Sequence, residues 1–440
     1  MTGTTEVVIV GAGFAGVACA RRLAAEPRAR VTIVDRNGYH QFQPLLYQIA
    51  TAELAPRDIR FDLGEMFARH ANVQTRTGEV DSIDPHGPAV TLTDGSTLAA
   101  DVLVLGAGAQ PNFFHTPGAD QLTLPLYSLD DAQRVRGRIL ELFRDAAAKP
   151  ELIDEGALTF VVVGGGATGV ETAGALAEIV HDVMPHVYPH LAIAGAKVIL
   201  VDLGHTVLSA FSEESHAYAA RQLQHRGVQL RLGVSVKQVT ADGVTLGDGS
   251  TIPTRLVVWG GGLMAAPLAG RSGLPQGRGG RIEVNPDLTV PGFPRVYALG
   301  DIANIPAADG ETLPQLGSVA QQAGDWAAGN IIAGIEGEQR QPFRYKDKGI
   351  MAMIGRKAAV AEIGPHRHEL KGRLAFAAWL GVHAQLLANA GAEMRAFATW
   401  LDDFYVRPAH RSAELLDPAT IDQPRIRTEE RAHDGTEHTG

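Results

Sequence analysis

The sequence predicts an α/β protein of two similar units, the second inserted in the first, followed by a C-terminal region of strands and helices. Three observations predict this architecture. An apolar run, a glycine cluster and a helical pattern follow one another in residues 6–35, and the same order returns in residues 158–202. A series of short strands follows each of them. The repeat of a whole layout indicates one structural plan used twice.

The first unit begins with glycines in G-x-G-x-x-G spacing. Gly11, Gly13 and Gly16 follow an apolar run, and the next apolar run ends on Asp35. Such glycines make a tight turn, admit backbone N–H groups to a pyrophosphate and let the helix pack on the strand, while the acid accepts hydrogen bonds from a ribose. The sequence therefore predicts a Rossmann-like unit that binds a dinucleotide. The spacing does not choose between FAD and NAD.

The second unit repeats these features. Its glycines are Gly164, Gly166 and Gly169, and its terminal acid is Asp202. A chain with two such units binds two dinucleotides, or binds one and keeps the other as a relic. Each unit continues through a predicted hairpin to a buried strand that ends in glycines.

Two further segments are predicted to serve the first unit. Residues 37–56 are too apolar for a solvated loop and contain residues that break regular structure, so they cover a ligand or fill their own core. Residues 282–290 and 295–303 are predicted to form a strand pair that ends at Gly300-Asp301. A helix is predicted from about Gly317, and the turn before it would place backbone N–H groups and Asp301 at a ligand.

The C-terminal region differs from both units. Residues 343–363 are predicted to form strands around turns, and residues 371–405 to form two helices. The second of these has an apolar face from Phe397 to Tyr405 and flanking cations, so it would lie in a membrane interface, on the first unit or on a second subunit. The polar, aperiodic tail at residues 417–440 is predicted to be disordered.

Composition narrows the classes of function. The net charge of -10 argues against a nucleic-acid partner, because its field repels polyanions. Cys19 is the only cysteine, which excludes a disulfide, a cysteine metal site and a redox-active cysteine pair. The N-terminus does not have the pattern of a leader peptide, and no apolar run reaches the length of a transmembrane helix. We therefore expect a cytoplasmic protein, with peripheral attachment to the inner membrane face as one option.

The chain resembles type II NADH dehydrogenase, the single-subunit NADH:quinone oxidoreductase of the two-dinucleotide-binding-domain flavoprotein superfamily. The resemblance spans nearly the whole chain. The segments that carry it are GAGFAG at 11–16, NGYHQFQPLLYQIAT at 37–51, GGGATGVETAGALAE at 164–178, YALGD at 297–301, KGIMAMIGRKAAVAE at 348–362 and WLGVHAQLL at 379–387. The stretches at 37–51 and 348–362 are more specific to this family than the glycine signatures are.

The resemblance implies the domains and the cofactors. Residues 1–120 and 281–345 would bind FAD, residues 121–280 would bind NADH, and residues 346–416 would form an acceptor-site, membrane-contact or dimer region. The implied cofactor-binding residues are Gly11, Gly13, Phe14, Ala15, Gly16, Asp35, Arg36, Gln43, Leu45, Gly108, Gly300, Asp301, Gly164, Gly166, Thr168, Gly169, Asp202 and Gly261. An acid at Asp202 suits NADH, because the 2′-phosphate of NADPH would meet a like charge.

The resemblance also implies a quinone acceptor. Glu171, Gln322 and Lys348 are the candidates for orienting or protonating it, although Glu171 would also be stabilised simply by its place in the first turn of a helix. The acceptor motif of the family has the form A-Q-x-A-x-Q. Here Ala320 and Gln322 match it, but Gly317 and Ser318 replace Ala-Gln, and Gln321 stands beside them. The shorter Ser318 would widen the site or leave a quinone carbonyl without its amide donor.

Two other functions are compatible with these residues. One is a soluble FAD-dependent NAD(P)H reductase that acts on a quinone-like or aromatic substrate in a biosynthetic pathway, which the Gly317-Ser318 departure favours. The other is a redox-sensing interaction protein that binds NADH and turns over slowly with every acceptor.

Overall fold

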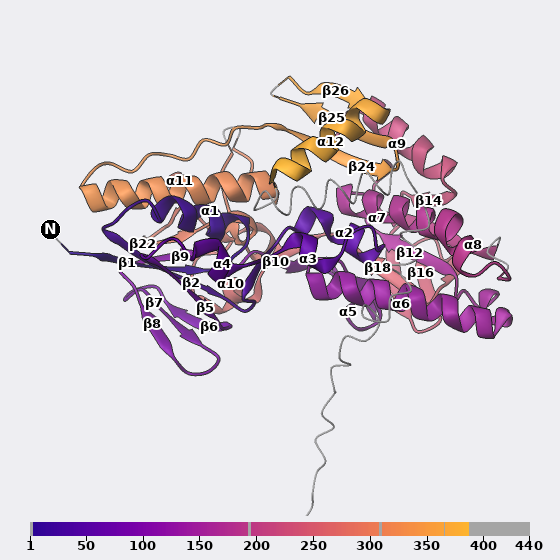
Figure 1. Ribbon diagram of the computed structural model, residues 1–440, viewed down its shortest axis with the longest axis horizontal. Coiled ribbons are helices and arrows are strands. Elements are labelled where there is room, and N and C mark those ends of the chain that lie inside the picture. The colour runs from indigo at the N-terminus through magenta and orange to yellow at the C-terminus, as the bar shows by residue number, and fades with distance from the viewer. Residues whose placement is uncertain (1–2, 192–194, 308–309, 365, 387–440) are drawn as a thin grey trace, which may run out of the picture.

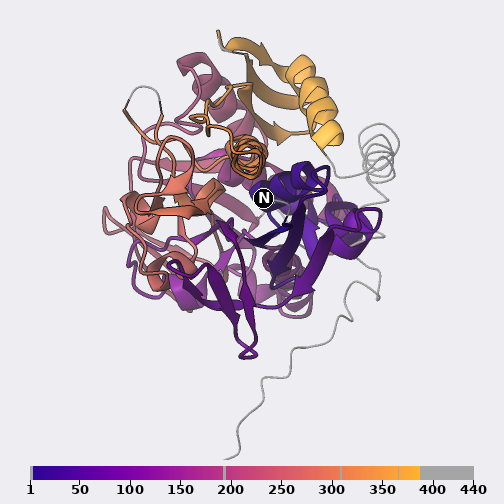
Figure 2. The ribbon, with the colours of Figure 1, turned by 90° about the vertical axis from the view of Figure 1, so that its left-hand side faces the viewer.

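The computed structural model describes residues 3–191, 195–307, 310–364 and 366–386. Its two main sheets lie next to each other along the longest axis of the molecule (Figure 1). Figure 2 shows the C-terminal strands and helix, in yellow, at the top of the molecule. The predicted α/β class with two Rossmann-like units is confirmed.

The sheet of the first unit has the strand order β21-β22-β9-β1-β2-β5. Its neighbours are parallel except for β21 and β22, which are antiparallel. The strands are β1 (Thr5–Val10), β2 (Ala29–Asp35), β5 (Val73–Thr77), β9 (Val102–Leu105), β21 (Thr289–Val290) and β22 (Phe293–Ala298). Because Val7, Ile9, Val31 and Ile33 are almost fully buried, the apolar runs read from the sequence form the centre of this sheet.

Helix α1 (Phe14–Leu23) lies between this sheet and α11 (Gly317–Glu336), as Figure 1 shows. A meander of β6 (Val80–Asp84), β7 (Ala89–Leu92) and β8 (Thr97–Ala99) extends below the sheet in that view. The remaining short elements of this unit are α4 (Leu63–Phe67), α10 (Pro267–Arg271), η5 (Arg278–Gly280), β20 (Ile282–Glu283), η6 (Gly300–Ile302) and β23 (Ala303–Asn304). The predicted pairing of 282–290 with 295–303 is found as two separate pairs, because β21 pairs with β22 in antiparallel and β20 pairs with β23 in parallel.

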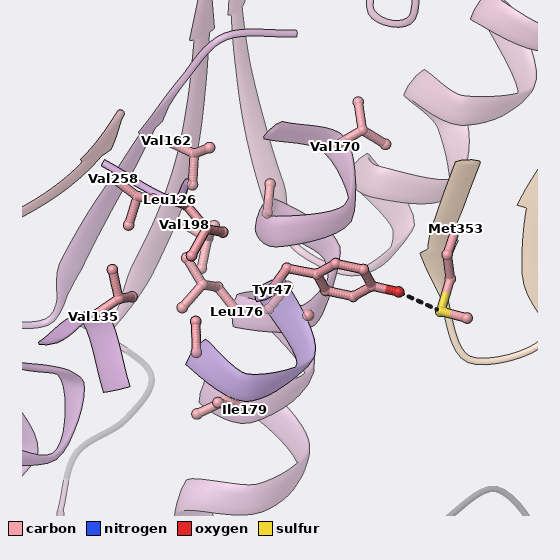
Figure 3. Close-up of a cluster of buried hydrophobic side chains, with 14 of the residues drawn as sticks. Tyr47, Leu126, Val135, Val162, Val170, Leu176, Ile179, Val198, Val258 and Met353 are labelled. Carbon is pink, nitrogen blue, oxygen red and sulfur yellow. Dashed lines mark hydrogen bonds between the residues drawn. The ribbon is translucent and has the colours of Figure 1, made fainter. Parts of the chain in front are cut away.

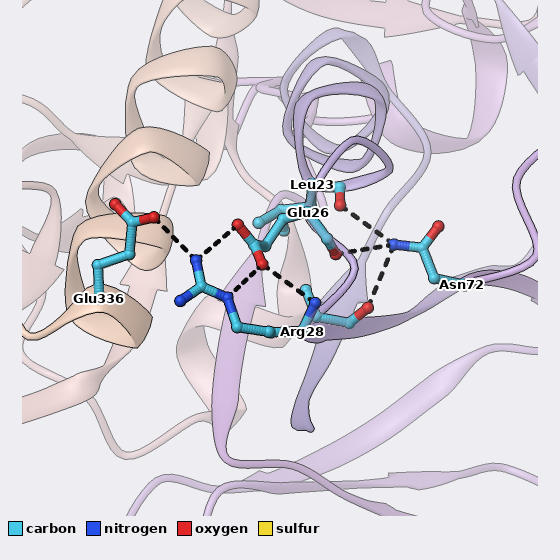
Figure 4. A network of polar contacts seen from close by, with 6 residues as sticks. Leu23, Glu26, Arg28, Asn72 and Glu336 are labelled. Carbon is cyan, nitrogen blue, oxygen red and sulfur yellow. Dashed lines mark hydrogen bonds and ion pairs between the residues drawn. The ribbon is translucent and has the colours of Figure 1, made fainter. Parts of the chain in front are cut away.

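A polar network fixes the far end of α1 (Figure 4). The guanidinium of Arg28 donates to both oxygens of Glu26 and to Glu336 at the end of α11. The side-chain amide of Asn72 donates to the carbonyls of Leu23, Glu26 and Ala29. These bonds join the last residue of α1 to the turn that follows it and to the start of β2.

The sheet of the second unit has the order β11-β18-β12-β13-β14, and its pairings are parallel. Its strands are β11 (Leu124–Pro125), β12 (Thr159–Val163), β13 (Lys197–Asp202), β14 (Val228–Leu232) and β18 (Leu256–Trp259), and its meander is β15 (Val236–Thr240), β16 (Gly243–Leu246) and β17 (Thr251–Pro253). Its helices are α5 (Ala119–Leu122), α6 (Leu129–Ala148), η2 (Pro150–Ile153), α7 (Ala167–Glu178), the π-helical turn η3 (Ile179–Val183), α8 (Met184–Val187) and α9 (Glu213–His225). The order of strand, glycine turn, helix and meander therefore matches that of the first unit.

A short antiparallel ribbon joins the two units. In it β10 (Ala109–Pro111) pairs with β19 (Leu263–Ala265), with Ala109 opposite Ala265. The chain thus leaves the first sheet and returns to it through neighbouring strands.

Residues 37–62 form short elements rather than a loop. These elements are β3 (Tyr39–Gln41), η1 (Gln43–Leu45), α2 (Leu46–Ala50), α3 (Pro56–Ile59) and β4 (Arg60–Asp62). Every side chain of α2 is buried, and α2 packs on α6 and α7 of the second unit. The hydroxyl of Tyr47 lies 3.3 Å from the sulfur of Met353 (Figure 3). The segment therefore fills a core, although that core is shared with the second unit rather than confined to its own.

The C-terminal region forms an antiparallel sheet and a helix. Its elements are β24 (Gly349–Gly355), β25 (Ala358–Ile363), β26 (His368–Lys371) and α12 (Gly372–Leu386). The strand predicted from residue 343 begins only at Gly349. The predicted helix face at Phe397–Tyr405 and the predicted disordered tail at 417–440 lie outside the described residues. Among the described residues, no helix is both long and apolar enough to cross a membrane.

Candidate functional site

The first glycine turn has the geometry that a pyrophosphate requires. Gly11 has a φ of +97°, and a side chain there would meet the carbonyl oxygen of Gly106. A Cβ on Gly16 would lie 1.9 Å from the carbonyl oxygen of Gly11, so only glycine lets the helix start this close to the strand. By contrast, the space beside the Cα of Gly13 is open. Backbone N–H groups at the start of α1 can therefore be reached by an anionic ligand.

Asp35 lies beside this turn at the end of β2. One carboxylate oxygen accepts from the N–H of Ala12 at 2.7 Å, and the other accepts from that of Asn37 at 2.7 Å. Burial raises the pKa of Asp35, and these two N–H donors oppose the rise. The carboxylate is thus held at the turn, with further lone pairs available to a ribose. Arg36 follows it directly.

Other predicted residues gather around the same turn. Gly300, with a φ of +68°, lies against Ala15 and Ala320, where a Cβ would be 3.3 and 3.1 Å from their methyl groups. Asp301 follows it, and burial raises the pKa of its carboxyl to about 6. The turn therefore adjoins the end of β22 and the start of α11.

A second set of residues meets at Tyr127. Its hydroxyl accepts from the N–H of Ala109 at 2.9 Å, and a Cβ on Gly108 would lie 3.0 Å from that hydroxyl. The amides of Gln41 and Gln43 donate to the carbonyl of Tyr127, at 3.1 and 3.3 Å. Burial, followed by the charge of Asp301, raises the pKa of Tyr127 to about 12. Leu45 is fully buried, and Phe14 packs edge-on against His40 and Phe42.

The second glycine turn repeats the first. Gly164 has a φ of +112°, and a Cβ on Gly169 would lie 1.8 Å from the carbonyl oxygen of Gly164. The carboxylate of Asp202 accepts from the N–H groups of Gly165 and Gly204, each at 2.6 Å. The space beside Gly166 is open, as it is at Gly13.

Two hollows border the second unit. An open one of about 640 Å³ is lined by Leu203, just after β13, and by residues 230–235 at the end of β14 and beyond it. A smaller one of about 90 Å³ lies between Tyr127, Thr168, Leu263 and the glycines 260 and 262. Gly261, predicted to bind a cofactor, stands between these two glycines. The smaller hollow thus lies between Thr168, in the glycine turn of the second unit, and Tyr127.

Glu171 lies in the first turns of α7 and is buried. Its carboxylate accepts from the N–H of Met353 on β24 at 3.1 Å. Burial raises the pKa of Glu171 to about 8, while hydrogen bonding by Met353 and Trp379 lowers it and the charge of Glu53 raises it. At neutral pH this carboxyl holds a proton in an apolar surrounding, which is the state of a general acid.

The predicted acceptor residues lie at the start of α11. The amide of Gln322 donates to the carbonyl of Lys346 and accepts from the N–H of Lys346, both at 3.0 Å, so one N–H and one lone pair are left for a ligand. Ser318 shares a hydrogen bond of 3.0 Å with the hydroxyl of Tyr345. Gly317 faces the ring of Phe14, whereas Gln321 and Lys348 are exposed.

Comparison with known proteins identifies the family. Residues 5–324 match the model described as pyridine nucleotide-disulphide oxidoreductase. The chain is 35% identical over 417 residues to type II NADH:quinone oxidoreductase Ndh of Mycobacterium tuberculosis, across 91% of this chain and 88% of that protein. The chain belongs to the type II NADH:quinone oxidoreductase family.

Further type II enzymes share the sequence or the fold. NdhA of Mycobacterium tuberculosis is 34% identical, across 90% of this chain and 87% of that one. The structure of NDH2 from Plasmodium falciparum in complex with NADH matches with a TM-score of 0.84 at 18% identity, across 92% of this chain and 99% of that one. In this type II family member Cys19 is buried within α1, and it is the only cysteine, so the disulphide chemistry named by the family model has no cysteine pair here.

The site contains residues that sequence reasoning missed. Tyr127, Tyr47, Met353 and Trp379 contact predicted residues or line the hollow, yet none stands in a recognisable spacing. Met353 and Trp379 reach Glu171 from β24 and α12, far along the chain. Tyr47, Met353 and Trp379 lie inside the stretches 37–51, 348–362 and 379–387 that carry the family resemblance, and this was the available signal.

Proposed function

We propose that the chain oxidises NADH and reduces a quinone, with FAD as the carrier and without pumping protons. The observation that carries the proposal is the identity of 35% across 91% of the chain to a type II NADH:quinone oxidoreductase. The geometry supports it through two glycine turns, each with an acid at the adjoining strand end. The soluble reductase with an aromatic substrate is not favoured, since the relatives at 35% and 34% identity are both quinone reductases.

In this proposal the first turn holds FAD and the second holds NADH. The open space at Gly13 and Gly166 admits a pyrophosphate, and the acids Asp35 and Asp202 accept from ribose hydroxyls. When bound, FAD would accept a hydride and pass on two electrons. The chain supplies the orientation of the two ligands at the hollow beside Tyr127 and Thr168. The domain boundaries at residues 120, 280 and 345 are part of the proposal.

Glu171 is the proposed proton donor to the reduced acceptor. Its support is a buried, protonated carboxyl on α7, covered by β24 and α12. Gln322 and Lys348 are proposed to orient the acceptor. Gln322 anchors both backbone groups of Lys346, two residues before Lys348, so it fixes the segment that bears this lysine.

The Ser318 hydroxyl is proposed to take the place of the amide that the family motif supplies. Its bond to Tyr345 makes a pair of hydroxyls at the start of α11. Hydroxyl groups both donate and accept, so the pair can still bind a quinone carbonyl. Ser318→Gln is then expected to change the KM for quinone and to leave the KM for NADH unaltered.

Attachment to the inner membrane face and assembly as a homodimer are also proposed. Their support is the outer face of α12, where Leu374, Val382 and Leu386 are exposed at 72%, 38% and 43%. A lipid-soluble acceptor requires a route from the bilayer. Flotation with vesicles tests the first proposal and sedimentation tests the second.

A two-stage anaerobic experiment tests the central proposal. Purified yellow protein is mixed with NADH, and a short-chain quinone is then added. We expect NADH to bleach the flavin absorbance and quinone to restore it. Bleaching without recovery would contradict quinone reduction, and slow recovery with every acceptor would favour the redox-sensing protein.

A further inference from the structure

One face of α7 carries two buried carboxylates and a glycine that all meet the same hairpin. Glu171, Gly174 and Glu178 stand at positions i, i+3 and i+7, which lie on one side of a helix. Glu171 accepts from the N–H of Met353 at 3.1 Å, and Glu178 accepts from the N–H of Arg356 at 2.5 Å. The two carboxylates therefore hold the backbone of the β24–β25 hairpin at two points, one on β24 and one in the turn after it.

Gly174 allows this close approach. A Cβ there would lie 2.1 Å from the carbonyl oxygen of Ile354, which is between the two held residues. Gly355 has the same role on the strand, since its Cβ would lie 2.6 Å from Glu178 and 2.3 Å from Arg226. The helix and the strand are thus in backbone contact between the two carboxylates.

Glu178 does more than accept one bond. Its oxygens lie 3.7 Å from Nε of Arg226 on the loop after α9 and 3.6 Å from Nε of Arg356 in the hairpin turn. Arg226 also donates to the carbonyl of Arg356 at 2.9 Å. The turn between β24 and β25 is therefore held through both backbone groups of Arg356.

The groups that face Glu171 come from several elements. They are the N–H of Met353 on β24, the indole of Trp379 on α12, Glu53 after α2 and, through its charge interaction, the hydroxyl of Tyr47 on α2. Glu178 stands two helical turns away, roughly 10 Å along the axis. The charge of Glu178 also acts on Tyr47. Removing a like charge would lower the pKa of Glu171, so only an upward shift reports a change in the position of the hairpin.

We propose that Glu178, with Arg226 and Arg356, is a positioning residue that holds the β24–β25 hairpin on α7 so that the N–H of Met353 stays on Glu171. The inference rests on the proposed role of Glu171 in quinone reduction. The alternative is that this clamp only stabilises the fold.

The test is an infrared titration of the FAD-containing enzyme. The carboxyl band of Glu171 is identified by its absence from Glu171→Gln, and its disappearance with pH is followed without quinone. Loss of an N–H donor to the ionised carboxylate raises its pKa, so Glu178→Ala should move the titration upward by about one pH unit. Glu178→Gln keeps an oxygen for the N–H of Arg356 and should restore most of the wild-type midpoint. Glu141→Ala, at an exposed ion pair on α6, is the matched control.

The pH profile of flavin reoxidation by quinone gives a second readout. Its descending limb should move with the infrared midpoint in Glu178→Ala, and this movement should vanish in a Glu171→Gln background. An unchanged infrared midpoint in Glu178→Ala would overturn the inference. If that variant does not fold, Arg226→Met should give the same upward shift at smaller size, and no shift would overturn the inference. Failure of wild type to reduce quinone would instead contradict the proposed function, with the infrared result still readable.

Discussion

The two glycine turns are nearly the same structure, but they are covered differently. In each, the first glycine has a positive φ, the third lies against the first, and the strand-end acid binds the N–H that follows the first glycine. Helix α1 is then covered by α11, where Gly324 comes so close that a Cβ would lie 2.1 Å from the carbonyl of Ala15. Helix α7 is covered by β24. The glycine that allows this close contact, Gly174, is on α7 itself rather than on the covering element.

The position two residues after the third glycine shows what this difference does. It is Ala18 in the first unit and Glu171 in the second. Ala18 has no polar side chain, whereas the buried carboxyl of Glu171 accepts a hydrogen bond from the N–H of Met353 on the covering strand. In the proposed function, a shared motif binds a nucleotide in both units, and the cover decides which unit also has the proposed acid.

The largest expected effect comes from filling the third glycine of either turn. Gly16→Ala and Gly169→Ala each place a methyl group within 2 Å of a backbone oxygen. We expect Gly16→Ala to yield protein without FAD, and Gly169→Ala to keep FAD while losing NADH binding. Visible absorbance and titration with NADH measure the two losses. Gly334→Ala on α11, where the space is open, should keep both cofactors.

The next effect separates the two strand-end acids. Asp202→Arg removes the acceptor of two N–H bonds and one of the proposed ribose contacts, so NADH should bind at least about tenfold more weakly. FAD content should be unchanged. Asp202→Asn should bind NADH with an affinity between that of wild type and that of Asp202→Arg. Equal loss of both cofactors would mean that the two turns have been assigned wrongly.

Glu171→Gln probes the acid that only the second unit has. The folded pKa of about 8 exceeds the ordinary 4.5, so the carboxyl does not change stability below pH 4.5 and destabilises the fold increasingly as pH rises to 8. The variant should therefore gain stability over wild type with rising pH, by at most a few kcal/mol. Urea unfolding at pH 5 and pH 8 measures it, and a gain of equal size at both pH values would contradict the raised pKa. The rate of flavin reoxidation by quinone should no longer decline near pH 8 in this variant.

The smallest expected effect concerns the neighbouring carboxylate. The charge of Glu53 contributes to the raised pKa of Glu171, after the larger effect of burial. Glu53→Gln should therefore lower the pH at which quinone reduction declines, by less than about one unit. Glu65→Gln, in the first turn of α4, is the control. It should leave the pH profile of quinone reduction unchanged.

Much of the fold could be predicted because it depends on local patterns. The glycine spacings, the buried strands and the helix from Gly317 need only neighbouring residues, and the structure has each of them. The cover of Glu171 could not be predicted, since Met353 and Trp379 reach it from distant segments. The segment at 37–56 was harder for the same reason, because its α2 packs on α6 and α7, which belong to the other unit.

The β10–β19 ribbon has a consequence for the way the two units are joined. Because Ala109 lies opposite Ala265, cutting out everything between them would leave two ends a single strand spacing apart, about 5 Å. A tight turn could join those ends. The second unit is therefore inserted at a single point beside the first sheet, and its removal would interrupt no strand of that sheet.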